Sequence, residues 1–162
     1  MFDLVHGLPV HPLVVHAVVV LVPLSLLGTV ALALRPAWRE RYGVLVLALT
    51  AVATVLIPVA TSSGEALEKR VGDPGVHAQL GDQMIWFQLP VLVTCAALVW
   101  FGQRARRGHA VGRTLALVVA ALAVVASVAS AVQVYRVGDS GARAVWGDQV
   151  SSAAAVAPRP IG

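Results

Sequence analysis

Three histidines stand at the beginning of the first long apolar run of the chain, in HGLPVHPLVVHAVVV at residues 6–20. His6, His11 and His16 follow one another at steps of five residues. Imidazole is the commonest metal ligand in proteins, and ionisable side chains at membrane depth often mark a functional site. The three residues therefore predict a binding function, with simple solvation at the water boundary as the alternative for each of them.

Other ligand-type side chains border the later apolar runs. Glu65 follows the second run, His77 precedes the third and Asp139 follows the fourth, while His109 stands apart in a basic segment. If the fold brings these ends together, nitrogen and oxygen ligands for zinc, copper or iron become available. The candidate metal ligands are His11, His16, Glu65, His77 and Asp139.

Composition identifies the chain as a membrane protein. Of its 162 residues, 58% are hydrophobic and 12% are charged, with a mean hydropathy of +0.81, whereas about a quarter of the residues of a soluble domain are charged. The formal charge of +4 comes from short basic clusters between apolar runs, where membrane topology explains them better than nucleic-acid binding. The single Cys95 excludes an internal disulfide, and the absence of CxxC and CxxCH argues against a thiolate cluster or covalent haem.

Four apolar runs are each long enough to cross a bilayer as a helix, which takes about 20 residues. They cover about residues 13–34, 44–63, 84–101 and 114–136, and their interiors carry no Asp, Glu, Lys or Arg. Short connections favour antiparallel neighbours. We therefore expect an all-α fold, a four-helix transmembrane bundle of up-down-up-down topology over residues 1–146, followed by a flexible C-terminal tail over 147–162.

Charge in the connections predicts the orientation. Segments 35–43 and 102–113 carry three and four arginines, and basic loops stay in the cytoplasm. Segment 63–83 holds four acidic and two basic residues, and the N-terminal flank has no Lys or Arg. Both termini and the 63–83 loop are therefore expected on the non-cytoplasmic side, so that all four helices deliver polar groups to one outer end of the bundle.

Helix geometry separates the N-terminal histidines. Pro12 suits the first position of a helix, which places His11 at the cap and His6 outside the helix. His16 is then roughly 7 Å deeper and rotated by roughly 140°, so His11 and His16 do not share a face. One of them can point into the bundle, where the small residues of the fourth span leave room for a neighbouring helix or a flat cofactor.

The motifs resemble those of a known family. HPLVVHAVVVLVP in the first span, SGE after the second, HAQLGDQ before the third and YRVGDSGARAVW after the fourth are similar to the DUF2231 family of predicted bacterial membrane proteins, over about residues 6–146. The resemblance implies a multi-pass protein of the inner (plasma) membrane, with a layout similar to small four-helix cytochromes that hold haem b between histidines. The family's histidine positions fall on His11, His16 and His77, whereas Asp139 stands where relatives are expected to carry a histidine.

Three functions are hypotheses from these residues. The first is a b-type haem electron-transfer protein in which His16 and His77 ligate the iron from different helices, with His11 as the substitute. The second is a membrane protein that binds a divalent metal ion through the five-residue set, in which Asp139 suits a harder ion. The third is a non-catalytic subunit or scaffold in the lipid bilayer that docks on a redox or membrane-complex partner. An enzyme is not expected, because no nucleophile elbow, HExxH, P-loop or dinucleotide motif is present.

Overall fold

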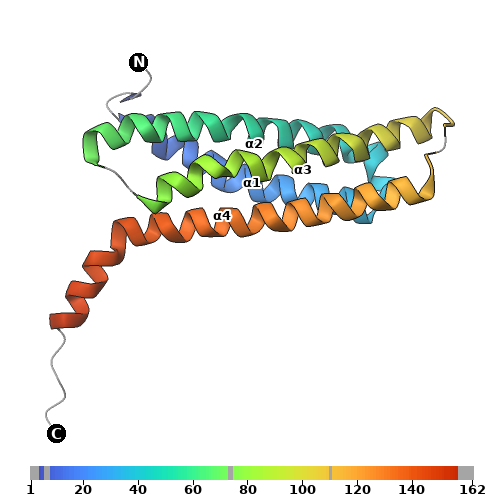
Figure 1. The fold of residues 1–162 in the computed structure, drawn as a ribbon. Coiled ribbons are helices and arrows are strands. Elements are labelled where there is room, and N and C mark those ends of the chain that lie inside the picture. Colours follow the sequence, from blue (N-terminus) through green and yellow to red (C-terminus); the bar gives the residue numbers. More distant parts are fainter. Residues whose placement is uncertain (1–3, 6–7, 73–74, 110, 157–162) are drawn as a thin grey trace, which may run out of the picture.

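The computed structural model describes residues 4–5, 8–72, 75–109 and 111–156, so His6 lies outside the described residues. Two strands of two residues each, β1 (Leu4–Val5) and β2 (Leu8–Pro9), pair antiparallel ahead of four helices. The helices are α1 (Val10–Leu34), α2 (Pro36–Val71), α3 (Val76–Arg106) and α4 (Arg113–Val156), and they form an elongated bundle (Figure 1).

The prediction of a helical protein with four membrane spans is confirmed. Each helix contains a stretch long and apolar enough to cross a membrane, at His11–Leu34, Pro36–Lys69, Val76–Arg106 and Arg113–Gly147. Apolar side chains point outward along every helix, and Leu27, Leu45, Val93 and Val125 are each more than 60% exposed. An outward apolar surface of this extent suits contact with lipid rather than with water.

The helices extend beyond the predicted spans. α2 has 36 residues and is about 54 Å long, whereas the hydrocarbon core of a bilayer is about 30 Å thick. Apolar length underestimates the helix because strong helix formers such as EALEKR (65–70) continue its hydrogen-bonded ladder in water. Glu65 and His77 therefore lie on helices, and the connection between α2 and α3 is 72–75 rather than the expected 63–83.

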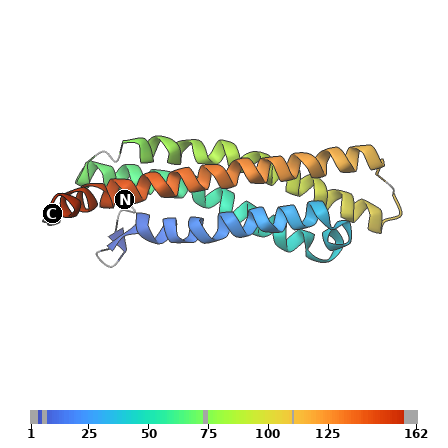
Figure 2. The ribbon, with the colours of Figure 1, turned by 90° about the horizontal axis from the view of Figure 1, so that it is seen from below.

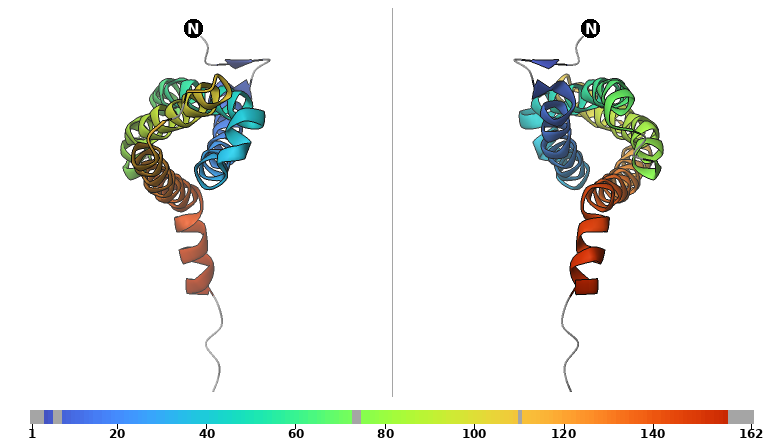
Figure 3. Two further views of the ribbon diagram at one scale, coloured as in Figure 1. Left: turned by 90° about the vertical axis from the view of Figure 1, so that its right-hand side faces the viewer. Right: turned by 90° about the vertical axis from the view of Figure 1, so that its left-hand side faces the viewer.

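Consecutive helices run antiparallel and pack side by side. Arg39 near the start of α2 lies against Gly102 near the end of α3, and midway Thr50 donates a hydrogen bond to the Cys95 sulfur at 3.9 Å. α4 packs against α1 as well as α3 and so closes the ring, as Figures 2 and 3 show. The starts of α1 and α3 therefore share one end of the bundle with the end of α2.

A chain of hydrogen bonds crosses the interior of the bundle at mid-helix. Gln88 of α3 is fully buried. Its Nε2 donates to Ser25 Oγ of α1 at 3.2 Å, and its Oε1 accepts from Ser130 Oγ of α4 at 3.1 Å. Polar side chains of this kind hold membrane helices together where lipid offers no hydrophobic driving force. Ser130, one of the small residues of the fourth span, thus contributes to the packing of α4 against α3.

Arg39 connects the start of α2 to the end of α1, at the opposite, arginine-rich end of the bundle. Its buried guanidinium donates from Nε to the Leu32 carbonyl at 2.8 Å and from Nη2 to the Ala33 carbonyl at 3.0 Å. These carbonyls belong to the last turn of α1, where no intrahelical donor is available and where the helix dipole favours a cation. The sequence predicted only a topological role for Arg39, so helix capping is an additional one.

α4 continues through the first part of the predicted tail. Residues 147–156 are helical, and the last turns of α4 lead away from the bundle in Figures 1 and 3. A helical segment that leads away from a bundle needs no apolar stripe. Hydrophobic periodicity therefore gives no signal for a helix over residues 147–156. Flexibility of this segment stays a prediction.

Candidate functional site

His11 joins the start of α1 to the end of α2. It lies in the first turn, where Pro12 is tolerated because the first N–H groups of a helix have no intrahelical acceptor. The Nδ1 atom of His11 is 3.0 Å from the Ala60 carbonyl oxygen and 3.2 Å from Ser63 Oγ. The ring lies over Gly64, where an added Cβ would stand 3.1 Å from the imidazole Cε1. The imidazole therefore links two helices, and glycine at the contact allows the ring to lie this close to α2.

His77 joins the start of α3 to α4 in the same way. Its Nδ1 is 3.1 Å from the Val137 carbonyl oxygen and 3.4 Å from Ser140 Oγ. The ring lies over Gly141, where an added Cβ would stand 3.0 Å from the imidazole Cε1. Both histidines are half-buried, so each is partly shielded by the helix that it contacts.

The two arrangements are counterparts. They are termed the His11 clasp (His11, Ala60, Ser63 and Gly64) and the His77 clasp (His77, Val137, Ser140 and Gly141). The α4 members of the second clasp each stand 77 positions after the α2 members of the first. In both clasps the serine hydroxyl also donates to the carbonyl that the imidazole contacts, at 2.9 Å. Deeper in the bundle Thr50 and Ser127, again 77 positions apart, each donate to the carbonyl four residues earlier at 2.7 Å. The α1–α2 and α3–α4 hairpins are therefore structural repeats of each other.

Hydrogen bonding determines the chemical form in which each imidazole is presented. A carbonyl oxygen can only accept a hydrogen bond, so in the neutral form of His11 and of His77 the proton lies on Nδ1 and the lone pair on Nε2. An Nδ1–H group bonded to a backbone carbonyl is typical of histidines that bind metals through Nε2. Each clasp therefore supplies one ring nitrogen that can ligate a metal or accept a proton.

His16, which was expected to be the best partner for His77, lies outside the clasps. Its side chain is exposed, and its Nδ1 contacts the Pro12 carbonyl one turn earlier on the same helix. The step of five residues from His11 rotates it by roughly 140° around α1, away from the interface with α2. The geometry therefore favours His11 over His16 as the counterpart of His77. His109 is exposed at the opposite end of the bundle.

The acidic candidates do not converge on the histidines. Glu65 is exposed on α2, and Asp139 on α4 forms an ion pair with Arg143 at 2.9 Å. Within the described ranges, no three His, Cys, Asp or Glu side chains form a group that could hold a metal ion. The structure thus brings two of the five predicted metal ligands, His11 and His77, into matching positions and leaves the five-residue set unassembled.

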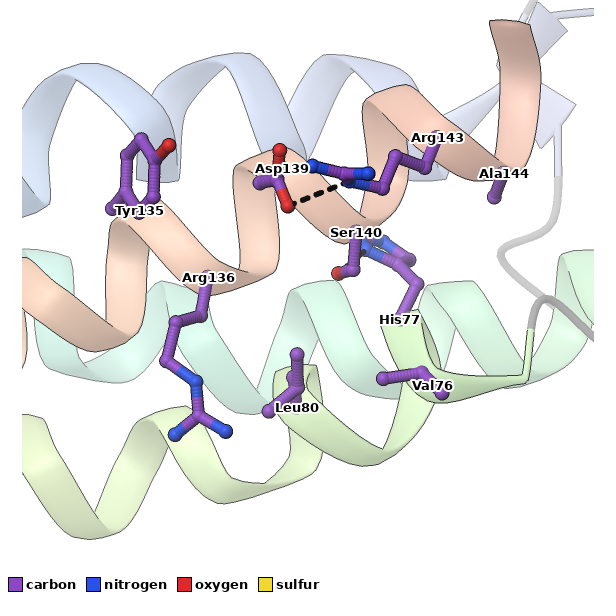
Figure 4. Close-up of a pocket in the computed structure, with 9 residues that line it drawn as sticks. All are labelled: Val76, His77, Leu80, Tyr135, Arg136, Asp139, Ser140, Arg143 and Ala144. Atoms are coloured by element: carbon purple, nitrogen blue, oxygen red, sulfur yellow. Dashed lines mark hydrogen bonds and ion pairs between the residues drawn. The ribbon is translucent and has the colours of Figure 1, made fainter. Parts of the chain in front are cut away.

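An open groove borders the His77 clasp between α3 and α4. It has a volume of about 520 Å³ and is lined by Val76, His77, Leu80, Tyr135, Arg136, Asp139, Ser140, Arg143 and Ala144. Figure 4 shows His77 and Ser140 lying between Arg143 on one side and Arg136 on the other. The groove therefore combines apolar walls with two guanidinium groups.

Sequence reasoning did not recognise the repeat or the buried Gln88. A signal for the repeat is the Ser-Gly pair at 63–64, which returns at 140–141, each time on the helix after one that begins with a histidine. Most of the other equivalent positions of the two hairpins differ in residue type, because many apolar residues serve equally well on a surface that faces lipid. A single amide within an apolar run has no spacing pattern at all, so Gln88 left no comparable signal.

Comparison with known proteins assigns the family but no relative of known function. No curated protein and no solved structure matches the chain. The family described as "Predicted membrane protein (DUF2231)" matches residues 7–154, a range that includes both clasps and all four membrane-spanning stretches. The protein therefore belongs to the DUF2231 family of predicted membrane proteins.

Proposed function

We propose that the protein crosses the bacterial plasma membrane in an up-down-up-down manner, with both clasps and both termini on the non-cytoplasmic side. Arginines are more numerous at the end away from the clasps, whereas acidic residues balance the basic ones at the clasp end, and segments with excess basic residues stay in the cytoplasm. At the arginine-rich end Arg35 lies over the ring of Trp38, Arg41 over Tyr42 and Arg104 over Trp100, at 5.7, 5.4 and 4.9 Å from the ring centroids. Such pairs of aromatic and basic side chains suit the boundary between membrane and water.

We propose further that the protein binds haem b for electron transfer, and that His11 and His77 are the residues that would hold it. The observation that carries this proposal is the carbonyl-bound Nδ1 of both imidazoles, which leaves Nε2 free to bind iron. The porphyrin supplies four iron ligands, so haem needs only one or two imidazoles from the chain. Haem b would supply one-electron transfer, the Nε2 atoms of His11 and His77 would hold it, and the carbonyls of Ala60 and Val137 would keep the imidazoles oriented.

A divalent metal ion is the second candidate cofactor. A zinc site takes three or four side-chain ligands, so Glu65 or Asp139 would have to turn toward a histidine. Asp139 would first have to release Arg143. Haem requires no such rearrangement of acidic side chains, which is why it is the first choice.

A structural role for the histidines, within a non-catalytic membrane subunit, is the third candidate. It is favoured by Gly64 and Gly141, since the imidazoles of His11 and His77 pack closely against these glycines. In this case the outward apolar faces of the bundle meet lipid or a partner subunit, and no cofactor is bound.

An absorption spectrum of the detergent-purified protein, recorded together with elemental analysis, tests these proposals. Haem ligation predicts a Soret band, as purified or after reconstitution, which His11→Ala and His77→Ala each weaken or shift. His16→Ala, an exposed histidine on the same helix as His11, and His109→Ala at the opposite end should leave the band unchanged.

Two other results would decide against haem. Stoichiometric zinc, copper or iron without a Soret band, lost in His77→Ala, would indicate a metal-ion site. A protein that takes up neither, and whose unfolding temperature falls in His11→Ala and His77→Ala but not in His16→Ala, would show that the clasps are structural.

A further inference from the structure

The groove beside the His77 clasp carries charge that the clasp itself does not require. Its α4 wall contains Tyr135, Arg136, Asp139 and Arg143. The α2 residues 77 positions earlier are Pro58, Val59, Ser62 and Ala66. None of these is charged, although the His11 clasp beside them has the same geometry. The two arginines are therefore not needed to hold a hairpin together and require a separate explanation.

The two guanidinium groups are held only loosely by the protein. The side chain of Arg143 is 78% exposed and pairs with Asp139 one turn earlier; such a surface pair contributes about 0–1 kcal/mol. Arg136 is exposed and reaches Gln133 Oε1 at 3.4 Å, beyond the usual range for a strong hydrogen bond. A step of seven residues returns to almost the same face of a helix, so both side chains can reach a ligand over Ser140.

The position and the walls of the groove fit a membrane lipid. The exposed Tyr135 stands near the end of the predicted fourth span, where aromatic side chains mark the interface between hydrocarbon and headgroups. Val76 and Leu80 supply an apolar wall from α3. Arginine binds phosphate oxygens through its planar fork of N–H donors. Figure 4 places Leu80 beside Arg136 and Val76 toward the Arg143 end, so apolar side chains accompany both guanidinium groups along the groove.

We propose that this groove binds an anionic phospholipid, with the phosphate between Arg136 and Arg143 and the glycerol and upper acyl segments against Leu80 and Tyr135. Figure 4 shows Arg136 extending toward Leu80 and Arg143 turned toward Asp139, one on each side of Ser140. Asp139 holds Arg143 beside the groove and leaves the arginine pair with one net positive charge, which matches a monoanionic phosphodiester. The site does not depend on whether the histidines bind a cofactor.

Native mass spectrometry of the full chain, released from detergent in the presence of added phosphatidylglycerol, tests this site. The double variant Arg136→Gln/Arg143→Gln should lose about tenfold in affinity for phosphatidylglycerol, because two charge-assisted contacts are removed. The matched control is Arg106→Gln/Arg107→Gln, which removes two exposed arginines at the other end of the bundle and should change the affinity by less than about twofold. Arg136→Lys/Arg143→Lys keeps the charge without the planar fork and should retain part of the binding.

Three results would overturn the proposal. The first is equal loss of phosphatidylglycerol in the two glutamine double variants, which would indicate attraction by overall charge. The second is equal retention of phosphatidylcholine, which would remove the role assigned to net charge. The third is displacement of the lipid by millimolar inorganic phosphate, which would identify a site for a free anion. Haem or metal content measured on the same samples reports separately on the histidines.

Discussion

The α1–α2 and α3–α4 hairpins share their internal contacts and differ on the surface beside them. Each begins with a histidine that crosses to the next helix and meets a backbone carbonyl, a serine and a glycine. Next to this contact, α2 presents Val59 and Ala66 where α4 presents Arg136 and Arg143. Close packing therefore restricts residue type within the clasp, whereas the neighbouring surface tolerates both apolar and charged side chains.

Replacing the glycine of either clasp with a larger residue is the change with the largest expected effect on stability. Gly64→Val and Gly141→Val would place a branched side chain where a Cβ alone already lies 3.1 or 3.0 Å from the imidazole. Overpacking of this kind costs about 1–3 kcal/mol, and both variants should lower the unfolding temperature in detergent by similar amounts. Gly138→Ala is the control, because a Cβ there meets nothing within 4 Å. A large effect at only one of the two glycines would contradict the equivalence of the clasps.

Replacing Gln88 should weaken the association between the two hairpins and leave the contacts of both clasps unchanged. Gln88→Leu removes the hydrogen bonds to Ser25 in the first hairpin and to Ser130 in the second. Interhelical hydrogen bonds in membrane proteins contribute about 0.6 kcal/mol each on average, so we expect a loss of about 1 kcal/mol in the free energy of unfolding. Gln103→Leu, an exposed glutamine on the same helix, should have little effect in the same thermal or denaturant titration. Equal stability of both variants would show that Gln88 does not couple the hairpins.

Transferring the arginines to the first hairpin is the change with the smallest expected effect. Val59→Arg/Ala66→Arg places guanidinium groups at the counterparts of Arg136 and Arg143. If the shared backbone geometry supports lipid binding, retention of phosphatidylglycerol in native mass spectra should rise by about twofold, because exposed charges contribute weakly. Unchanged lipid retention would mean that the apolar wall of the α3–α4 groove is also necessary.

Some features of the site could be predicted from residue types, and others could not. Apolar run length revealed four spans, and the family motifs pointed to His11, His16 and His77, of which the structure places His11 and His77 in equivalent interhelical contacts. His16 was preferred to His11 as the partner of His77, but the spacing of residues along the first span does not determine which face of α1 meets α2. The polar partners of His11 are 49 and 52 residues away in sequence, and helix periodicity does not predict contacts at that separation.

The sequence alone determined that this protein is a bundle of four membrane-crossing helices, because length, hydropathy and the absence of charge within each run are local properties that a bilayer selects directly. The tertiary structure decided which polar groups meet. It placed His11 and His77 in two equivalent clasps, Gln88 across the interior and Arg39 over the end of α1. The physical reason is that each of these contacts depends on the rotation of one helix against another, and that rotation is set by packing at glycines and small side chains.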